Sequence, residues 1–430
     1  MLQKNEREDN YNIPWYALSA NRLLATLGSL KGEVNCDICV VGGGFTGVSA
    51  ALELSLKGFS VILLESRSIA FGATGRNGGQ LIRGFAKGLD WMIGKYGVND
   101  ASFLCKVTME GLGTVLNRIS THEIKCDLKF GHLTAALHKK HIEDLKSEAE
   151  SWKKIGYPDL ELMDAKAVQE VVKAKPYIGG LMDPKGAHFH PINYALGVAQ
   201  AAQKAGCKIY DETPATEVIL GPQPKVITAR GKVNAKYVIL AGVNNIKGAE
   251  KLSRRSIVAM AHMIATEPLG LRRARNLMAK DVAVSDSRFI MDYYRFSSDY
   301  RLLFGGNCNY NNADTPGEDE RLRQRMLKVF PAISMVRIDH CWKGPLELTM
   351  NRMPDIGRLS PQVYYAHGFG GQGVIVTNIV GKILAEAIGG QAQRFDVFAK
   401  IKHRNFPGGD LLKRPLFVAG MTWFKLRDMI

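Results

Sequence analysis

The sequence predicts a mixed α/β (α+β) fold, and three features of the chain carry that prediction. Residues 38–65 contain an apolar run, a glycine-rich turn, an amphipathic stretch and a second apolar run. Residues 363–388 repeat the order of strand, glycine turn and helix, and strand-like runs dominate residues 256–309. This combination is typical of a β-α-β unit joined to a second, strand-rich region.

The first unit is the most readable part of the chain. Ile38 to Val41 is a short apolar strand, and the turn Gly42–Gly47 follows at once. Residues 48–57 have the spacing of a helix, and residues 60–64 form the next strand, which ends on Glu65. Such a unit, with these spacings, is the start of a Rossmann-like domain.

The turn in this unit has the pattern of a dinucleotide site. Gly42 permits a tight turn, Gly44 lets the backbone approach a pyrophosphate at the helix N-terminus, and Gly47 allows close packing of helix on strand. Glu65 is placed to accept hydrogen bonds from ribose hydroxyls, and an acid there disfavours a 2′-phosphate. The alternative, an ordinary glycine-rich turn, is the weaker interpretation because strand, helix and acid all agree with a nucleotide.

A second glycine loop favours FAD over NAD as the cofactor. It spans residues 71–80, soon after Glu65, and a long flavin dinucleotide needs backbone donors along its whole length. The turn 370–373 opens another helix, whose positive end would face the reduced flavin. The predicted FAD-binding residues in these three turns are Gly42, Gly44, Phe45, Thr46, Gly47, Glu65, Ser66, Ala73, Thr74, Arg76, Asn77, Gly78, Gly79, Gln80, Gly370, Gly371, Gln372 and Gly373.

The remaining segments give a coarser prediction. Residues 88–160 have helical spacing, and residues 193–205 form another amphipathic helix. Residues 218–220 and 226–228 flank a Gly-Pro-Gln-Pro turn and predict a hairpin, and residues 237–242 form a buried strand.

Composition excludes several classes of protein. The 430 residues are 46% hydrophobic and 23% charged, as in globular proteins rather than disordered or fibrous ones. The net charge of +16 permits a nucleic acid, a membrane surface or an acidic ligand as partner and selects none of them. We expect part of this positive charge, from residues such as Arg76, to interact with the FAD pyrophosphate. The polar N-terminus is unlike a signal peptide and no run approaches the length of a spanning helix, so we expect a cytoplasmic protein.

The cysteines and histidines predict no metal site. Cys36 and Cys39 stand three apart on a predicted strand, where side chains at i and i+3 point to opposite faces. No second pair completes a zinc set, and His188 and His190 have no evident third ligand.

With these motifs together, the sequence resembles the D-amino-acid oxidase/sarcosine oxidase superfamily of FAD enzymes. Further stretches are similar to the γ-glutamylputrescine oxidase branch, and the resemblance covers nearly the whole chain. The motifs that carry the superfamily resemblance are Gly42-Gly-Gly-Phe-Thr-Gly47, Phe71-Gly-Ala-Thr-Gly-Arg-Asn-Gly-Gly-Gln80, Thr349-Met-Asn-Arg-Met-Pro-Asp-Ile-Gly357 and Gly368-Phe-Gly-Gly-Gln-Gly373. The stretches that carry the branch are residues 16–20, 294–306 and 406–428.

The resemblance implies a Rossmann-like FAD-binding domain and a discontinuous mixed β-sheet substrate domain that covers the flavin. It implies that Val218 meets the adenine through its backbone, that Ala241 and Gly242 close near the pyrophosphate, and that Arg83 holds a substrate carboxylate. The candidate substrate residues are Arg83, Tyr293, Glu347 and Arg352. The implied division is an N-terminal segment 1–33, an FAD-binding domain 34–88, 161–250 and 349–390, a substrate domain 89–160 and 251–348, and a C-terminal extension 391–430.

Three departures from the superfamily pattern shape the expected chemistry. Leu346 stands where sarcosine oxidases carry the cysteine that attaches flavin, so we expect non-covalent FAD. Ile375 replaces a lysine that helps to bind a carboxylate, which disfavours a small amino acid as substrate. The strand 302–305 reads Leu-Leu-Phe-Gly and lacks the lysine that activates dioxygen, so the electron acceptor is dioxygen or another molecule.

The predicted function is therefore FAD-dependent oxidation of a small amine, either a polyamine derivative or an amino acid-like compound. A hydride passes to flavin N5, and the resulting imine hydrolyses to an aldehyde. One alternative is a flavin dehydrogenase at a membrane surface or a tRNA-modifying flavoenzyme; scattered cations and the absence of a nucleic-acid motif argue against RNA, and peripheral membrane contact stays open. A second alternative is a non-catalytic FAD-binding protein, which loss of Glu65 or of the first glycines would have favoured.

Overall fold

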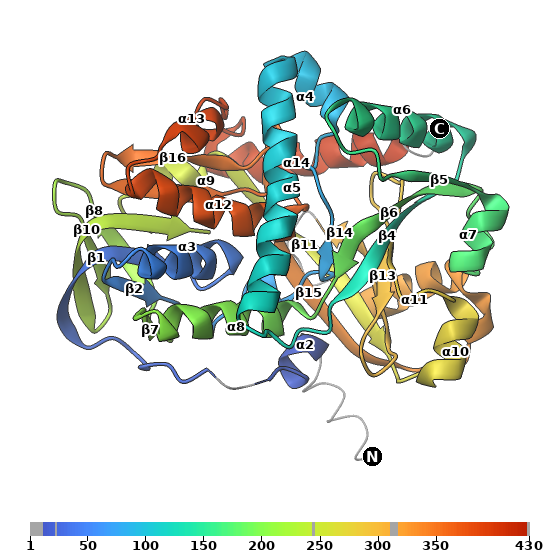
Figure 1. Ribbon diagram of the computed structural model, residues 1–430, viewed down its shortest axis with the longest axis horizontal. Helices are drawn as coiled ribbons and strands as arrows, with labels where there is room; N and C mark the ends of the chain where they lie inside the picture. The colour runs from blue at the N-terminus through green and yellow to red at the C-terminus, as the bar shows by residue number, and fades with distance from the viewer. Residues whose placement is uncertain (1–11, 22–23, 243–245, 310–316, 428–430) are drawn as a thin grey trace.

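The computed structural model describes residues 12–21, 24–242, 246–309 and 317–427, and these form two β-sheets flanked by helices. The sheet that begins with β1 lies on the left in Figure 1 and the second sheet lies on the right. The long helix α5 stands upright between them in this view.

The first sheet has eight strands in the order β16-β17-β10-β1-β2-β7, and the hairpin β8-β9 attaches to β10. β1 pairs in parallel with β2 and with β10, and β10 pairs in parallel with β17. The carboxyl ends of these four strands therefore meet at one edge of the sheet. The strands are β1 (Gly32–Val41), β2 (Val61–Leu64), β7 (Lys208–Tyr210), β8 (Ala215–Ile219), β9 (Lys225–Thr228), β10 (Gly231–Ala241), β16 (Asp355–Ser360) and β17 (Val363–His367).

Helices α3 (Phe45–Leu56) and α12 (Gly373–Ile388) pack on this sheet and on each other. The crossing is close because Gly381 has no side chain: a Cβ there would lie 2.5 Å from the Thr46 carbonyl oxygen. Both helices begin at the edge where the parallel strands end, which brings two helix N-termini to one place. The β-α-β unit predicted from the sequence is confirmed, as are the predicted hairpin β8-β9 and the helix before β7, α8 (Pro191–Lys204).

The second sheet is mixed and has nine strands in the order β15-β11-β14-β13-β12-β4-β6-β3, with β5 attached to β6. Its pairs are antiparallel except for β12 with β4. The strands are β3 (Gln80–Leu81), β4 (Lys129–Ala136), β5 (Glu161–Asp164), β6 (Gly179–His188), β11 (Ser256–Thr266), β12 (Ala283–Asp286), β13 (Tyr293–Phe296), β14 (Leu302–Asn309) and β15 (Ile338–Thr349).

Two sequence predictions about this region are wrong. Residues 88–160 are not all helical, because β4 lies between α5 (Val98–Thr121) and α6 (Lys139–Lys154). The segment 161–188 was assigned to the FAD-binding domain, but β5 and β6 pair with each other and with β4 in the second sheet. The physical reason is that β4 and β6 are buried on both faces over most of their length, so they lack the alternation that marks a strand in a sequence.

The remaining helices of the described chain are α2 (Trp15–Leu18), α4 (Leu89–Tyr96), α7 (Ala165–Val171), α9 (Glu250–Ser253), α10 (Gly270–Leu277), α11 (Glu318–Val329), α13 (Gln393–Ala399) and α14 (Gly409–Arg427), with 3₁₀ turns η1 (Ala73–Gly75) and η2 (Pro331–Ile333). Among the described residues no single helix is long and apolar enough to cross a membrane. Helices α12 and α13 meet these two requirements only when they are taken together, as a pair bent by 118°. All seven cysteines are free thiols. Within the same ranges, no three His, Cys, Asp or Glu side chains are arranged to hold a metal ion.

Candidate active site

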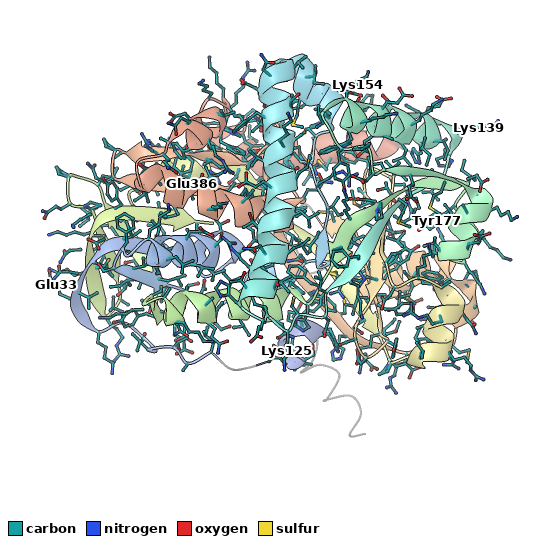
Figure 2. The ribbon with its side chains drawn as sticks, viewed as in Figure 1. Glu33, Lys125, Lys139, Lys154, Tyr177 and Glu386 are labelled. Carbon is teal, nitrogen blue, oxygen red and sulfur yellow. The ribbon has the colours of Figure 1, made fainter. Side chains whose placement is uncertain are left out.

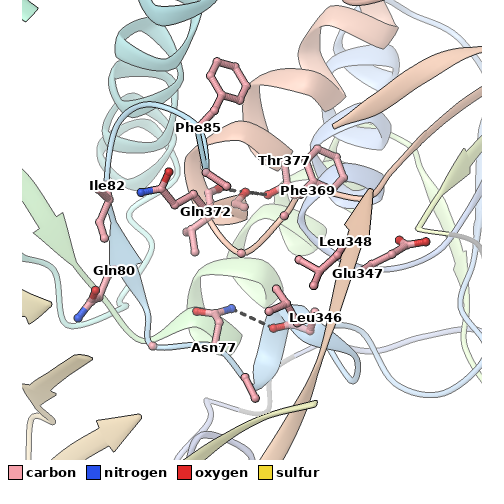
Figure 3. Close-up of a pocket in the computed structure, with 18 of the residues that line it drawn as sticks. Asn77, Gln80, Ile82, Phe85, Leu346, Glu347, Leu348, Phe369, Gln372 and Thr377 are labelled. Atoms are coloured by element: carbon pink, nitrogen blue, oxygen red, sulfur yellow. Dashed lines mark hydrogen bonds between the residues drawn. The ribbon is translucent and has the colours of Figure 1, made fainter. Parts of the chain in front are cut away.

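A cavity of about 860 Å³ lies where the two sheets meet, and all three predicted glycine turns line it. In Figure 3, Asn77, Gln80 and Ile82 are on one side of the opening, and Leu346 and Phe369 are on the other. The first two belong to the second glycine loop and β3, whereas Leu346 lies on β15. Segments far apart in the sequence therefore build one site.

The first turn has a backbone that only glycine allows. Gly42 has φ +109°, and a Cβ there would lie 2.3 Å from the Ala241 carbonyl oxygen. A Cβ on Gly47 would lie 1.8 Å from the Gly42 carbonyl oxygen, so this residue sets how closely α3 approaches β1. Glu65 Oε2 accepts the Gly43 N–H at 2.6 Å and therefore braces the turn beside the cavity.

The second loop is held against the start of α3 by its own side chains. Thr74 Oγ1 accepts the Phe45 N–H at 3.0 Å. Asn77 Nδ2 donates to the carbonyls of Ala73 at 3.0 Å and Thr74 at 2.7 Å, and Asn77 Oδ1 accepts the Gly79 N–H at 2.7 Å. The loop is thus a rigid floor of the cavity rather than a loose flap.

Arg76 holds the second loop to distant parts of the chain. Its guanidinium donates to the carbonyl oxygens of Phe71, Asn12 and Lys343 at 3.0–3.1 Å, and it lies 5.0 Å from the centre of the Phe71 ring. The guanidinium therefore ties the N-terminal segment and β15 to the second loop. Arg76 also lines the cavity, and that its charge serves the FAD pyrophosphate stays a prediction.

The third turn places backbone and side-chain polar groups at the start of α12. Gly370 and Gly371 have φ of +70° and +101°, and Gly373 is the first residue of the helix. The side-chain oxygen of Gln372 is buried and has no hydrogen-bond donor within the described chain. Gln372 lies at the centre of the opening in Figure 3, so this acceptor is available to a bound molecule.

Glu347 is occupied within the wall of the cavity. Its carboxylate accepts hydrogen bonds from Ser256 Oγ at 2.5 Å, His367 Nδ1 at 3.0 Å and the Gly368 N–H at 3.1 Å. Burial opposes its ionisation, but the bonds from His367 and Ser256 outweigh burial and lower the pKa of Glu347. In Figure 3 its carboxylate points away from Leu346; that Glu347 binds a substrate ammonium stays a prediction.

His367 is a charged residue behind the wall of the cavity, bonded to Glu347, that sequence reasoning missed. It is 1% exposed, and its second nitrogen, Nε2, bonds Asp355 at 3.2 Å. Desolvation disfavours the cation, but hydrogen bonds to Asp355 and Glu347 outweigh it and raise the pKa of His367 to about 9. A signal existed: His367 directly precedes the third turn, and Asp355 belongs to the Pro-Asp pair of the quoted motif.

Tyr293 and Arg352 do line the cavity. Tyr293 fits between two glycines: a Cβ on Gly78 would touch its ring at 3.0 Å, and one on Gly305 at 2.2 Å. Tyr294, the next residue, is buried in the core instead, as alternation along a strand predicts. Arg352 has φ +61° and donates to the Gly370 carbonyl at 3.2 Å, so it supports the third turn from the cavity side.

Arg83 lines the cavity but is not open to a substrate. It forms an ion pair with Asp183, and the two side chains are 7% and 5% exposed. Arg83 therefore already holds a carboxylate of this chain, which contradicts the expectation that it waits for one from the substrate.

The structure brings most of the predicted residues together. All four candidate substrate residues and most of the predicted FAD-binding residues line the cavity, with Ala241 and Gly242 among them. Gly47, Gly79 and Val218 do not. Val218 was expected to offer its backbone to adenine, but its N–H donates to the Lys247 carbonyl at 2.8 Å; Thr213 and Ala215, just before it, line the cavity instead.

The cavity fits an FAD molecule by its construction. Two helix N-termini and the three glycine turns face it, and both features suit a pyrophosphate and an extended dinucleotide. The unsatisfied oxygen of Gln372 adds an acceptor at the far end. These features define the class of the protein: an FAD-dependent oxidoreductase with a nucleotide sheet and a second, covering sheet.

Comparison with known proteins identifies the family. The chain belongs to the FAD dependent oxidoreductase family (DAO), whose model matches residues 37–387. It is an enzyme of the amine and amino-acid oxidase type.

Relatives match over nearly the full length. The chain is 39% identical over 418 residues to "Gamma-glutamylputrescine oxidoreductase" of Escherichia coli (strain K12), covering 97% of this chain and 98% of the relative. It is 37% identical over 404 residues to "Probable oxidoreductase OrdL" of Haemophilus influenzae, covering 92% of each. Among solved structures, glycine oxidase from Geobacillus kaustophilus superposes with a TM-score of 0.71 at 18% identity, over 86% of this chain and 100% of that one, which shows a shared fold.

Proposed function

We propose that this enzyme oxidises a small amine, of the polyamine-derivative type, to an imine that hydrolyses to an aldehyde. One observation carries the proposal: beyond the glycine turns, the lining of the cavity includes the acidic side chains of Asp144 and Glu148 on α6. Acidic side chains in a cavity favour a cationic substrate, and the full-length similarity to a gamma-glutamylputrescine oxidoreductase supports the same substrate class.

Each part of the cavity has a role in this proposal. FAD, when bound, supplies the acceptor for the hydride that leaves the carbon bearing the amine. The N-terminus of α3 and the first turn would hold its pyrophosphate, and Glu65 would hold its ribose. The third turn and Gln372 would hold the flavin end, where the start of α12 favours negative charge.

The protein residues at the substrate end position the amine rather than perform proton transfer. Tyr293 is fixed between Gly78 and Gly305 and presents a rigid wall. Leu346, Phe369 and Met421 give the cavity apolar surface that excludes water from the reacting carbon. No residue of the described chain is assigned as a general base.

The electron acceptor is dioxygen or another molecule. The strand that would carry an activating lysine has Leu302, Leu303 and Phe304 there, all fully buried. This supports slow reaction with dioxygen and a second physiological acceptor. The proposed compartment is the cytoplasm, which the seven free cysteines support.

The RNA alternative has little support on the surface. The lysines labelled in Figure 2 include Lys139 and Lys154, which lie at the two ends of α6, and Lys125, which lies apart from them. We therefore retain no nucleic-acid partner in the proposal.

Anaerobic reduction of the bound flavin tests the proposal. The purified holoenzyme is titrated with γ-glutamylputrescine, putrescine, sarcosine and glycine, and the flavin absorbance is followed before and after air is admitted. We expect bleaching by the polyamine derivative and slow return of colour in air. Flavin that stays oxidised with all amines contradicts the proposal, and bleaching by the amino acids alone would reassign the substrate class.

A further inference from the structure

The ion pair between Arg83 and Asp183 closes what would otherwise be an anion site in the cavity. Both residues line the cavity, and Asp183 is 3% exposed. The Arg83 guanidinium packs against the rings of Trp152 and Tyr157, whose centres are 5.0 and 4.5 Å away. A buried guanidinium positioned by such contacts is suited to bind one carboxylate.

Asp183 is built to stay in that position. Its Oδ1 accepts the Tyr157 hydroxyl at 2.7 Å and the Lys185 N–H at 3.1 Å, while Oδ2 pairs with Arg83. Gly186 leaves room for it, because a Cβ there would lie 3.0 Å from Asp183 Oδ2. The carboxylate therefore has donors on both oxygens.

The surroundings oppose a second carboxylate. Glu148 lines the cavity and interacts electrostatically with Arg83. A substrate carboxylate that approached Arg83 would have to displace Asp183 and approach the acidic side chain of Glu148.

We propose that Asp183 takes the place of a substrate carboxylate on Arg83, and that the enzyme thereby selects amines without a carboxylate on the carbon that bears the amine. This inference rests on the proposed function and adds the residue that decides the substrate class. Asp183 is a specificity-determining residue, since it excludes one class of substrate by occupying its binding group.

The variant Asp183→Asn tests it by gain of binding. FAD-loaded wild type and D183N are titrated with sodium benzoate, and binding is followed by the flavin spectrum and by Tm, with sodium chloride at matched ionic strength as reference. We expect benzoate to bind D183N about tenfold to a hundredfold more tightly, the size of a charge-assisted hydrogen bond, and to raise its Tm. Asp100→Asn, which neutralises an exposed carboxylate in the first turn of α5 that does not line the cavity, is the matched control and should leave benzoate affinity unchanged.

A second variant covers the case in which D183N folds poorly. Tyr157→Phe removes one donor to Asp183 but keeps the ion pair, and we expect a smaller gain in benzoate affinity. Folded variants that bind benzoate no better than the wild type overturn the inference and leave Asp183 as a structural partner. Because the readout is binding, it stands even if no amine reduces the flavin, an outcome that would defeat the proposed function alone.

A separate observation concerns the surface of α14. Its inner face carries Phe417 and the buried Met421, which lines the cavity. Its outer face is apolar: Leu412, Leu416 and Trp423 are 51%, 47% and 65% exposed. The spacing of these three residues places them along one stripe of the helix. Lys413, by contrast, turns inward and donates to the Ser253 carbonyl at 2.5 Å.

Exposed cations lie near α14. Lys251 and Arg254 are exposed on the segment that Lys413 contacts through the Ser253 carbonyl. Lys402 and Arg404 are exposed just before the helix. Residues 391–430 contain eight Lys or Arg and three Asp or Glu. An apolar stripe on a helix with cations near it is the pattern of a helix that lies in the interface of an anionic membrane.

We infer that α14 docks on an anionic phospholipid surface, with Leu412, Leu416 and Trp423 in the interface and the cavity beside it. The full-length protein is mixed with phosphatidylcholine vesicles with and without phosphatidylglycerol and separated by flotation. We expect flotation only with phosphatidylglycerol, weaker at high salt, and lost in Leu416→Asp but not in Leu271→Asp, which changes a leucine of α10 that is 53% exposed. Failure of the protein to float with these vesicles overturns the inference. It is also overturned if light scattering shows that the wild type is a dimer and that Leu416→Asp is a monomer.

Discussion

At the scale of single residues, His367 is protonated in the folded protein, and the effect of this charge on stability can be measured. Its pKa in the folded protein is about 9, above the ordinary value of about 6.5. The charged His367 therefore contributes its full stabilisation of the folded protein below about pH 6.5, and this stabilisation is lost as the pH rises through 9. Between pH 6 and pH 10, loss of this charge should lower the free energy of unfolding of the wild type by on the order of 3 kcal/mol. We expect the variant His367→Gln to lack this decrease.

Urea unfolding of wild type and variant at a series of pH values measures this difference. His138→Gln, at an exposed histidine on the N-terminal side of α6, is the control. Parallel curves for the wild type and His367→Gln would mean that His367 is not charged in the folded protein.

A second residue-scale prediction concerns the link to flavin. Leu346 lines the cavity where a cysteine would attach the cofactor, and Cys341 does not line it. We expect acid denaturation to release all FAD into solution and to leave a polypeptide of unmodified mass. Cys308 does line the cavity, so a chain that retains the mass of FAD would point to this thiol, and Cys308→Ser would then release it.

At the scale of elements, the contact between α3 and β1 decides whether the nucleotide turn forms. A Cβ on Gly47 would meet backbone atoms of Gly42, which cannot move aside as a flexible side chain can. We expect Gly47→Ala to cost roughly 3 kcal/mol or more and to yield protein with little FAD. Gly94→Ala on α4, where no atom lies within 4 Å, should be neutral or stabilising by up to about 1 kcal/mol; equal urea midpoints for the two variants would contradict this account.

The same comparison shows which elements a sequence can predict. The first β-α-β unit was predicted because its signals are local: a strand, a glycine turn and a helix follow one another within about 30 residues. The helix begins at Phe45 rather than at residue 48, since the last part of the turn is already helical. β4 was missed because strands buried on both faces lack alternation, and its pairing with β6 joins residues far apart in the chain.

The predictions about the site also depended on whether the signal is local in the sequence. The glycine turns that face the cavity were predicted from local spacing, and they do line it. The partners of Arg83 and Glu347 were not predicted, because Asp183 is 100 residues from Arg83, and Ser256 is 91 residues from Glu347. Which charges are neutralised within the protein depends on such distant pairs, and the chemistry of the substrate end therefore became readable only in the folded chain.

At the scale of the whole molecule, the cavity joins the two sheets, and a cofactor held there should stabilise both. Residues from the first sheet, such as Gly42 and Ala241, line it together with Tyr293 and Leu346 of the second. A ligand that binds only the folded state adds about 4 kcal/mol when its concentration is a thousand times Kd. We expect removal of FAD to lower the Tm by several degrees and its return to restore it, with a single unfolding transition in the holoenzyme. The measurement is calorimetry of apoprotein and holoenzyme, and an unchanged Tm would mean that FAD does not bridge the two sheets.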